Sequence, residues 1–152
     1  MTTEMTPMPQ PTANLVFDGN CAEAMRFYEQ VLNGKLQALI SNGQSPMAAH
    51  LPPEAHDRIM HAYLVLPNND GALMAVDTRS GEPYEGMKGF QLTLNYDTIA
   101  QAEQVFNALS VGGKVTMPMQ AMFYAKRFGM LTDRFGTPWM VNGELIPMPA
   151  IN

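Results

Sequence analysis

The sequence predicts an α+β fold of two βαβββ modules, whose curved and mostly antiparallel sheets surround a cup. The first observation is an internal repeat: "AEAMRFYEQVLNGKL" (Ala22–Leu36) resembles "AQAEQVFNALSVGGKV" (Ala100–Val115) at a spacing of about 78 residues. The second is that both repeats carry the apolar periodicity of an amphipathic helix. The third is that one strand-like run precedes each helix and three such runs follow it. Half of a 152-residue chain buries too little surface alone, so the halves are expected to share a core.

The first module is expected at residues 13–77. "NLVFD" (Asn14–Asp18) is typical of a short strand, and a helix is expected at Asn20–Leu32. Asn20 stands three residues before Glu23, which is the spacing of a capping box at a helix start. Three strands are then expected at Lys35–Ile40, Ile59–Leu66 and Ala72–Asp77.

The second module is expected at residues 88–144. The run "FQLTLNY" (Phe90–Tyr96) alternates apolar and polar residues, as a strand with one buried face does. A helix is expected at Thr98–Leu109, with Thr98 as its cap and a glycine pair after its end. Three strands are then expected at Lys114–Gln120, Ala125–Asp133 and Thr137–Gly143.

The remaining segments are expected to be irregular. Prolines at positions 7, 9 and 11 predict an extended N-terminal arm over residues 1–12. Residues 145–152 are expected to form a C-terminal tail. Residues 41–58 and 77–88 are rich in proline and glycine, which predicts surface loops next to the cup.

The composition indicates one globular domain and excludes several functions. The formal net charge is −5 and no basic stripe is present, so no nucleic-acid partner is expected. No apolar run approaches the ~20 residues of a membrane span, so no membrane partner is expected either. The N-terminus lacks the features of a signal peptide, and one cysteine fits a reducing, cytoplasmic compartment. Cys21 is interpreted as a small buried residue rather than as a nucleophile, because no histidine lies near it in the sequence.

Four segments carry a resemblance to a known family. They are Val16–Leu36, Asp57–Leu66, Gly89–Asn95 and Gly112–Asn142, the last of which includes "DRFGTPWMVN". Together with the doubled module, they resemble the vicinal oxygen chelate superfamily of glyoxalases, bleomycin-resistance proteins and dioxygenases, and in particular its PhnB-like branch. The resemblance implies the glyoxalase/bleomycin-resistance fold. It also implies a homodimer, in which modules often pair across subunits.

Enzymes of this superfamily hold a divalent metal with ligands on the first and last strand of each module. Transferred to this chain, the ligand positions are Ala13, the apolar stretch Met74–Val76, Gln91 and Met140. Only Gln91 has a side chain that can bind a metal. The resemblance therefore predicts that the usual full metal site is missing.

A rearranged metal site is the alternative. His61, Gln91 and Glu144 together would supply a histidine, an amide and a carboxylate. His61 is more typical of a histidine that is hydrogen-bonded within its sheet, and Glu144 of a solvated carboxylate at a strand end. Both interpretations remain open at this point.

The residues expected to contact a ligand lie on the strands and turns that line the cup. They are His61, Gln91, Thr93, Phe123, Tyr124, Trp139 and Met140. Transfer of the superfamily pattern places Met140 inside the cup. Trp139 would then lie behind it, unless Pro138 delays the start of the strand and leaves Trp139 at the rim. Core packing and a place in the cavity wall are equally compatible with Trp139.

Two functions follow from these expectations. The first is a PhnB-like protein that binds a small organic molecule in the cup without the usual metal, and needs no cofactor. The second is a divalent-metal-dependent lyase, isomerase or transferase that uses His61, Gln91 and Glu144. The sequence does not decide between them, and it does not identify the ligand.

Overall fold

The computed structural model describes residues 9–79 and 81–151, so most of the expected N-terminal arm lies outside the described residues. The first module consists of β1 (Ala13–Phe17), α1 (Cys21–Val31), β2 (Lys35–Ser41), β3 (Ile59–Val65) and β4 (Ala72–Asp77). The second consists of β5 (Leu92–Tyr96), α2 (Ile99–Ser110), β6 (Lys114–Met122), β7 (Ala125–Thr132) and β8 (Pro138–Leu145). Short 3-10 helices lie between strands at Asn42–Gln44, Pro46–His50, Pro53–Ala55 and Pro67–Asn69.

Each module forms one four-stranded sheet. The strand orders are β1-β4-β3-β2 and β5-β8-β7-β6, so the two halves repeat the same topology. The first strand of each module pairs in parallel with the last, and the other pairings are antiparallel. This arrangement confirms the predicted α+β fold with two βαβββ modules.

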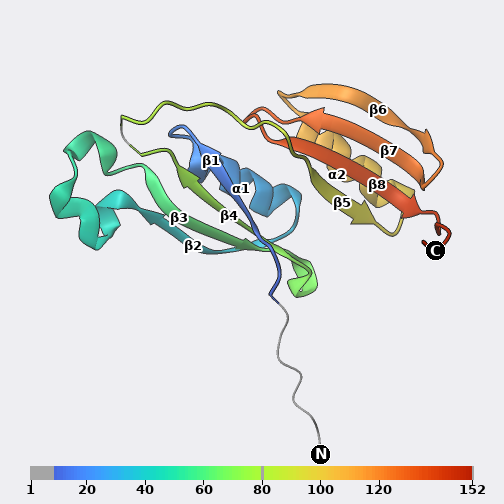
Figure 1. The fold of residues 1–152 in the computed structure, drawn as a ribbon, viewed down its shortest axis with the longest axis horizontal. Helices are drawn as coiled ribbons and strands as arrows, with labels where there is room; N and C mark the ends of the chain where they lie inside the picture. Colours follow the sequence, from blue (N-terminus) through green and yellow to red (C-terminus); the bar gives the residue numbers. More distant parts are fainter. Residues whose placement is uncertain (1–8, 80, 152) are drawn as a thin grey trace, which may run out of the picture.

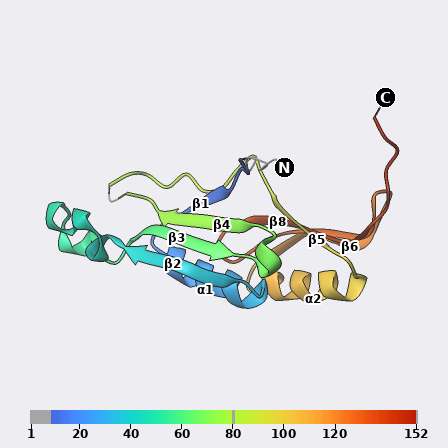
Figure 2. The same ribbon diagram turned by 90° about the horizontal axis from the view of Figure 1, so that it is seen from below.

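The two sheets lie side by side, and one helix covers each of them (Figure 1). Both helices lie on the same side of the molecule (Figure 2). Each sheet therefore has one face covered by a helix and one face that no helix covers, which we call its open face. Because both open faces point the same way, the two modules of one chain do not face each other across a cup.

The start of α1 differs from the sequence-based expectation. The Asn20 side chain makes no capping hydrogen bond. Instead, the buried Asp77 carboxylate at the end of β4 accepts hydrogen bonds from the backbone N–H groups of Gly19 and Cys21, at 2.7 and 3.1 Å. Its second oxygen accepts from the Ile59 N–H at 2.8 Å. At α2 the predicted cap is confirmed, because Thr98 Oγ1 accepts from the Gln101 N–H at 3.1 Å.

A buried hydrogen-bond network joins the modules. The Tyr28 hydroxyl of α1 donates to Asp133 Oδ2 at 2.6 Å and contacts Thr137 Oγ1 at 2.8 Å, both in the turn between β7 and β8. Trp139 Nε1 donates to the same Asp133 oxygen at 2.8 Å. Burial and the Asp133 carboxylate raise the pKa of Tyr28, so its phenol stays a neutral donor. The "DRFGTPWMVN" segment thus serves first to hold the two halves together.

The core lies between the sheets and their helices, and it includes Phe17, Met25, Tyr28, Leu64, Leu109, Trp139 and Val141. Cys21 is part of it, and burial raises the pKa of its thiol to about 12, with a smaller contribution from Asp77. A thiol so buried and so weakly acidic is a poor nucleophile, which agrees with its interpretation as a packing residue. Among the described residues, no helix is both long and apolar enough to cross a membrane.

Candidate binding face

The open face of the second sheet carries residues from three neighbouring strands. Along β8, Trp139 and Val141 point into the core, so the alternate residues Met140 and Asn142 lie on the open face. The register pairs Met140 with Thr93 of β5 and with Met130 of β7. Residues paired directly across strands share a face, so these side chains form one row across the sheet.

Polar groups surround the sulfur atoms of this row. Thr93 Oγ1 lies 3.9 Å from Met140 Sδ, and Tyr124 Oη lies 3.8 Å from the same atom. Gln91 Nε2 lies 3.9 Å from Met130 Sδ. The structure thus gathers four of the seven sequence-predicted residues, namely Gln91, Thr93, Tyr124 and Met140, at one place. Their role in ligand binding remains a prediction.

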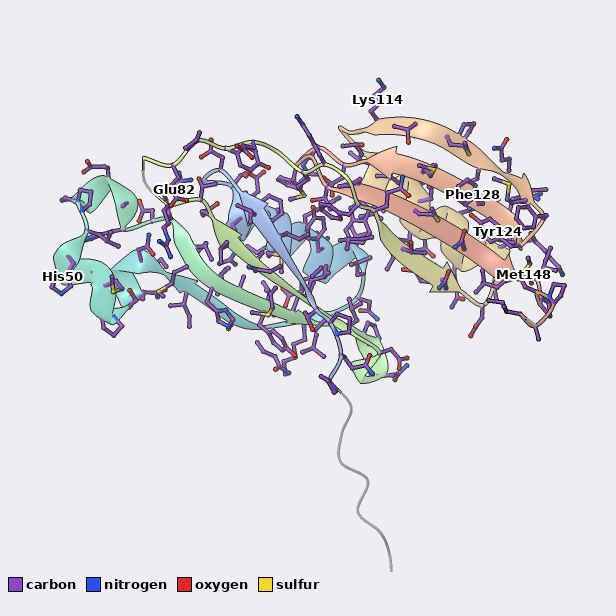
Figure 3. All side chains as sticks on the ribbon, viewed as in Figure 1. His50, Glu82, Lys114, Tyr124, Phe128 and Met148 are labelled. Carbon is purple, nitrogen blue, oxygen red and sulfur yellow. The ribbon has the colours of Figure 1, made fainter. Side chains whose placement is uncertain are left out.

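Aromatic rings stand beside this row. Tyr124 lies in the turn between β6 and β7, and its ring meets that of Phe128 edge-on at a centroid distance of 5.8 Å (Figure 3). Phe123, the fifth predicted residue, is 72% exposed, and its ring meets the Tyr124 ring edge-on at 5.2 Å. Phe123 is therefore the solvent-exposed member of this aromatic group, whereas Phe128 is 3% exposed.

The far end of the same face is polar. Asn142 Nδ2 donates to Asn95 Oδ1 at 2.9 Å. Asn142 is only 3% exposed, and its own Oδ1 has no hydrogen-bond partner among the described residues. Lys126 and Glu144 form an ion pair at 2.8 Å beside a shallow pocket of about 550 Å³. The alternation of β5 places Asn95 on the polar face with Gln91 and Thr93, but nothing in the local pattern distinguishes Asn142 or Lys126 from ordinary strand residues.

The open face of the first sheet is more apolar. His61 pairs with Ile40 of β2, and Tyr63 pairs with Met74 of β4. Val16 and Ile40 are both 38% exposed there. His61, the sixth predicted residue, is half-buried on this face, in the other module from Gln91, Thr93 and Met140.

The rearranged metal site is contradicted by the register of the second sheet. Leu92 pairs with Trp139, so Gln91 lies level with Pro138, six residues from Glu144 along β8. At about 3.3 Å per residue, Gln91 and Glu144 are about 20 Å apart, and no ion can bridge that distance. Glu144 is also paired with Lys126. Within the described part of the chain, no three histidine, cysteine or acidic side chains form a group that could hold a metal. The residues present therefore do not fit the divalent metal of the superfamily.

The prediction that Trp139 lies at the rim of the cup is wrong. Regular alternation begins at Pro138, which already pairs with Thr132 of β7. Trp139 consequently points toward the helices, is 1% exposed and meets the Tyr28 ring edge-on at 5.4 Å. Trp139 therefore lies in the core behind the open face and not on that face.

A second groove, of about 1220 Å³, lies between the modules. The end of α1, the connection from β3 to β4, strand β5 and helix α2 line it. Its side chains include several amides and the carboxylates of Asp70 and Asp97, and no lysine, arginine or histidine of the described residues lines it. No local pattern in the sequence indicates this groove, because it depends on how the two modules pack.

Comparison with known proteins agrees with this fold. Protein YjdN of Escherichia coli (strain K12) is 32% identical over 136 residues, which cover 84% of this chain and 90% of that protein. The crystal structure of protein PA1353 from Pseudomonas aeruginosa superposes with a TM-score of 0.82 at 48% identity, covering 90% of this chain and 98% of the other. A Bacillus cereus PhnB protein, named as a putative 3-demethylubiquinone-9 3-methyltransferase, has the same fold, with a TM-score of 0.73 at 23% identity and coverage of 89% and 99%.

A solved structure named as a PhnB protein thus shares the fold of this chain. The family model of the superfamily matches residues 10–141, which include the first module and the second as far as the middle of β8. The chain belongs to the Glyoxalase/Bleomycin resistance protein/Dioxygenase superfamily.

Proposed function

We propose that this protein binds a small organic molecule on the open face of the second sheet, without the divalent metal of its superfamily. The observation that carries the proposal is the uncovered group around Met140, where thioethers, three polar side chains and aromatic rings meet. An apolar surface with a few convergent polar groups is the usual composition of a small-molecule site. Met140 stands where the superfamily pattern places a metal-binding glutamate, so this surface offers packing and hydrogen bonds in place of coordination.

We further propose that a second copy of the chain completes the cup. Both open faces point the same way in one chain (Figure 2), so neither can cover the other. A two-fold axis would place the first sheet of each copy over the second sheet of its partner, which closes the assembly at two subunits. The apolar character of the first open face, with Val16 and Ile40 exposed, suits that role. The result is a cup with one apolar wall and one wall that also carries polar groups.

The metal-dependent enzyme is not proposed. It required His61, Gln91 and Glu144 to converge, and the register separates two of them by about 20 Å. Asp77, the nearest carboxylate to the apolar positions of β4, is already occupied by three backbone N–H groups. The printed name of the Bacillus cereus protein does not change this, because a likeness at 23% identity shows the fold alone.

A fragment screen by ligand-observed NMR tests the proposed binding face. We expect hits that bind the wild-type protein and bind Met140→Glu at least tenfold more weakly, because a carboxylate would put a charge in place of the thioether and engage the hydroxyls of Thr93 and Tyr124. Met60→Glu is the matched control. Met60 is exposed on β3 and alternates away from the open face. The absence of hits, or hits that lose affinity equally in both variants, would contradict the proposal.

A further inference from the structure

Three hydrogen-bond donors on the binding face contact only sulfur. They are the Gln91 amide, the Thr93 hydroxyl and the Tyr124 hydroxyl, at 3.8 to 3.9 Å from Met130 Sδ or Met140 Sδ. Within the described part of the chain, none of them donates to an oxygen or nitrogen atom. A thioether sulfur is a weak acceptor, so an oxygen atom of a ligand can take the place of water at these donors without breaking a strong hydrogen bond within the protein.

The charge of this place limits what such a ligand can be. Gln91, Thr93 and Tyr124 are neutral, and within the described part of the chain no lysine or arginine contacts any of them. Lys126, on the same face, is paired with Glu144 at 2.8 Å. A phosphate or carboxylate at these donors would therefore have no positive charge in contact with it to offset its loss of water. A carbonyl oxygen accepts hydrogen bonds from neutral donors and has a much smaller desolvation cost.

The surface beside the three donors favours the binding of a flat, polarisable molecule. Met130 and Met140 form a thioether floor, and thioether sulfurs contact aromatic rings favourably. The Tyr124 ring stands at the edge of this floor and is held in place by Phe123 and Phe128 at 5.2 and 5.8 Å. A planar molecule that packs on these two thioethers would contact the edge or face of the Tyr124 ring, and an oxygen atom of the molecule would reach the donors.

We propose that the ligand is an uncharged, planar, aromatic or conjugated molecule with a carbonyl oxygen. The thioethers of Met130 and Met140 hold its ring, and the hydroxyls of Tyr124 and Thr93, which both lie beside Met140 Sδ, donate to its oxygen. This inference rests on the proposed function and adds the chemical class of the ligand. It also assigns Tyr124 as the residue that determines specificity for the carbonyl group.

The test uses three probes of similar shape on the full-length protein, with affinities from protein-observed NMR titration. They are 2-acetylnaphthalene, which carries a neutral carbonyl group, 2-ethylnaphthalene, which lacks an acceptor, and 2-naphthoate, which is an anion. We expect 2-acetylnaphthalene to bind at least fivefold more tightly than either of the others. Tighter binding of 2-naphthoate would overturn the proposal.

Two variants locate the effect. Tyr124→Phe keeps the ring and removes one of the donors, so it should reduce the preference for 2-acetylnaphthalene over 2-ethylnaphthalene at least twofold, mainly by weakening the binding of 2-acetylnaphthalene. Tyr84→Phe, in the connection between the modules, should leave both affinities unchanged. A preference that Tyr124→Phe leaves unchanged refutes the proposal.

The outcome separates this inference from the proposed function. If the three probes bind equally, the face does not select a carbonyl group and binds ligands of another class. The same conclusion follows if none of the three probes binds while hits from the fragment screen still depend on Met140. If none of the probes binds and the fragment screen gives no hits, the proposed function itself is refuted.

Discussion

Replacing Asp133 with alanine should lower the free energy of unfolding by about 4 kcal/mol, because hydrogen bonds to a buried charged group contribute about 1.5–3 kcal/mol each and do not add fully. The carboxylate accepts from Tyr28 and Trp139 through one oxygen. It accepts from the backbone N–H groups of Phe135 and Thr137 through the other, at 2.9 and 3.0 Å. Its removal leaves four buried donors without this partner and disconnects the first module from the turn before β8.

Urea unfolding followed by Trp139 fluorescence measures this change directly, since the only tryptophan donates to Asp133. Tyr28→Phe removes only the hydrogen bonds of α1 to this turn. It should lower the free energy of unfolding by less than half as much as Asp133→Ala does. Asp57→Ala is the control, because Asp57 is exposed and should change stability by no more than about 0.5 kcal/mol. Similar values for Asp133→Ala and Asp57→Ala would refute the assigned role of the network.

Replacing Asp77 with asparagine should lower the free energy of unfolding by about 2–3 kcal/mol, although the side chain keeps its shape. Both carboxylate oxygens accept from backbone N–H groups, of Gly19 and Cys21 on one side and of Ile59 on the other. An amide has one acceptor, so its NH₂ group must face at least one N–H donor. The start of α1 also loses the negative charge that stabilises it.

Asp70→Asn supplies the comparison for Asp77→Asn. Asp70 is exposed in the connection from β3 to β4, so the same chemical change should have little effect on a thermal unfolding curve. If Asp77→Asn and Asp70→Asn had the same melting temperature, the cap of α1 would not depend on the Asp77 carboxylate.

Features that depend on local patterning were predictable from the sequence. The repeat, the periodicity and the turn residues located both helices and all eight strands, and the alternation of β8 placed Met140 opposite Trp139. The cap of α2 was also predictable, because Thr98 and Gln101 are three residues apart.

Contacts between distant residues were not predictable in this way. The carboxylate that caps α1 comes from Asp77, more than fifty residues later in the chain, and no local signal distinguishes it from Asn20 as the cap. Likewise, Trp139 appeared suited to a cavity wall because its partner Tyr28 lies in the other module. The separation of Gln91 from Glu144 required the strand register, which a single sequence does not provide.

The molar mass of the protein in solution, measured by light scattering at micromolar concentration, tests most directly whether two copies form the cup. We expect a mass of twice 16.8 kDa for the wild-type protein. We expect 16.8 kDa for Val16→Glu, because this substitution places a charge on the open face of the first sheet. Val111→Glu makes the same change at a more exposed position after α2, away from both open faces, and should remain a dimer. A wild-type mass of 16.8 kDa, or a dimer that persists in Val16→Glu, would contradict the cup between two copies.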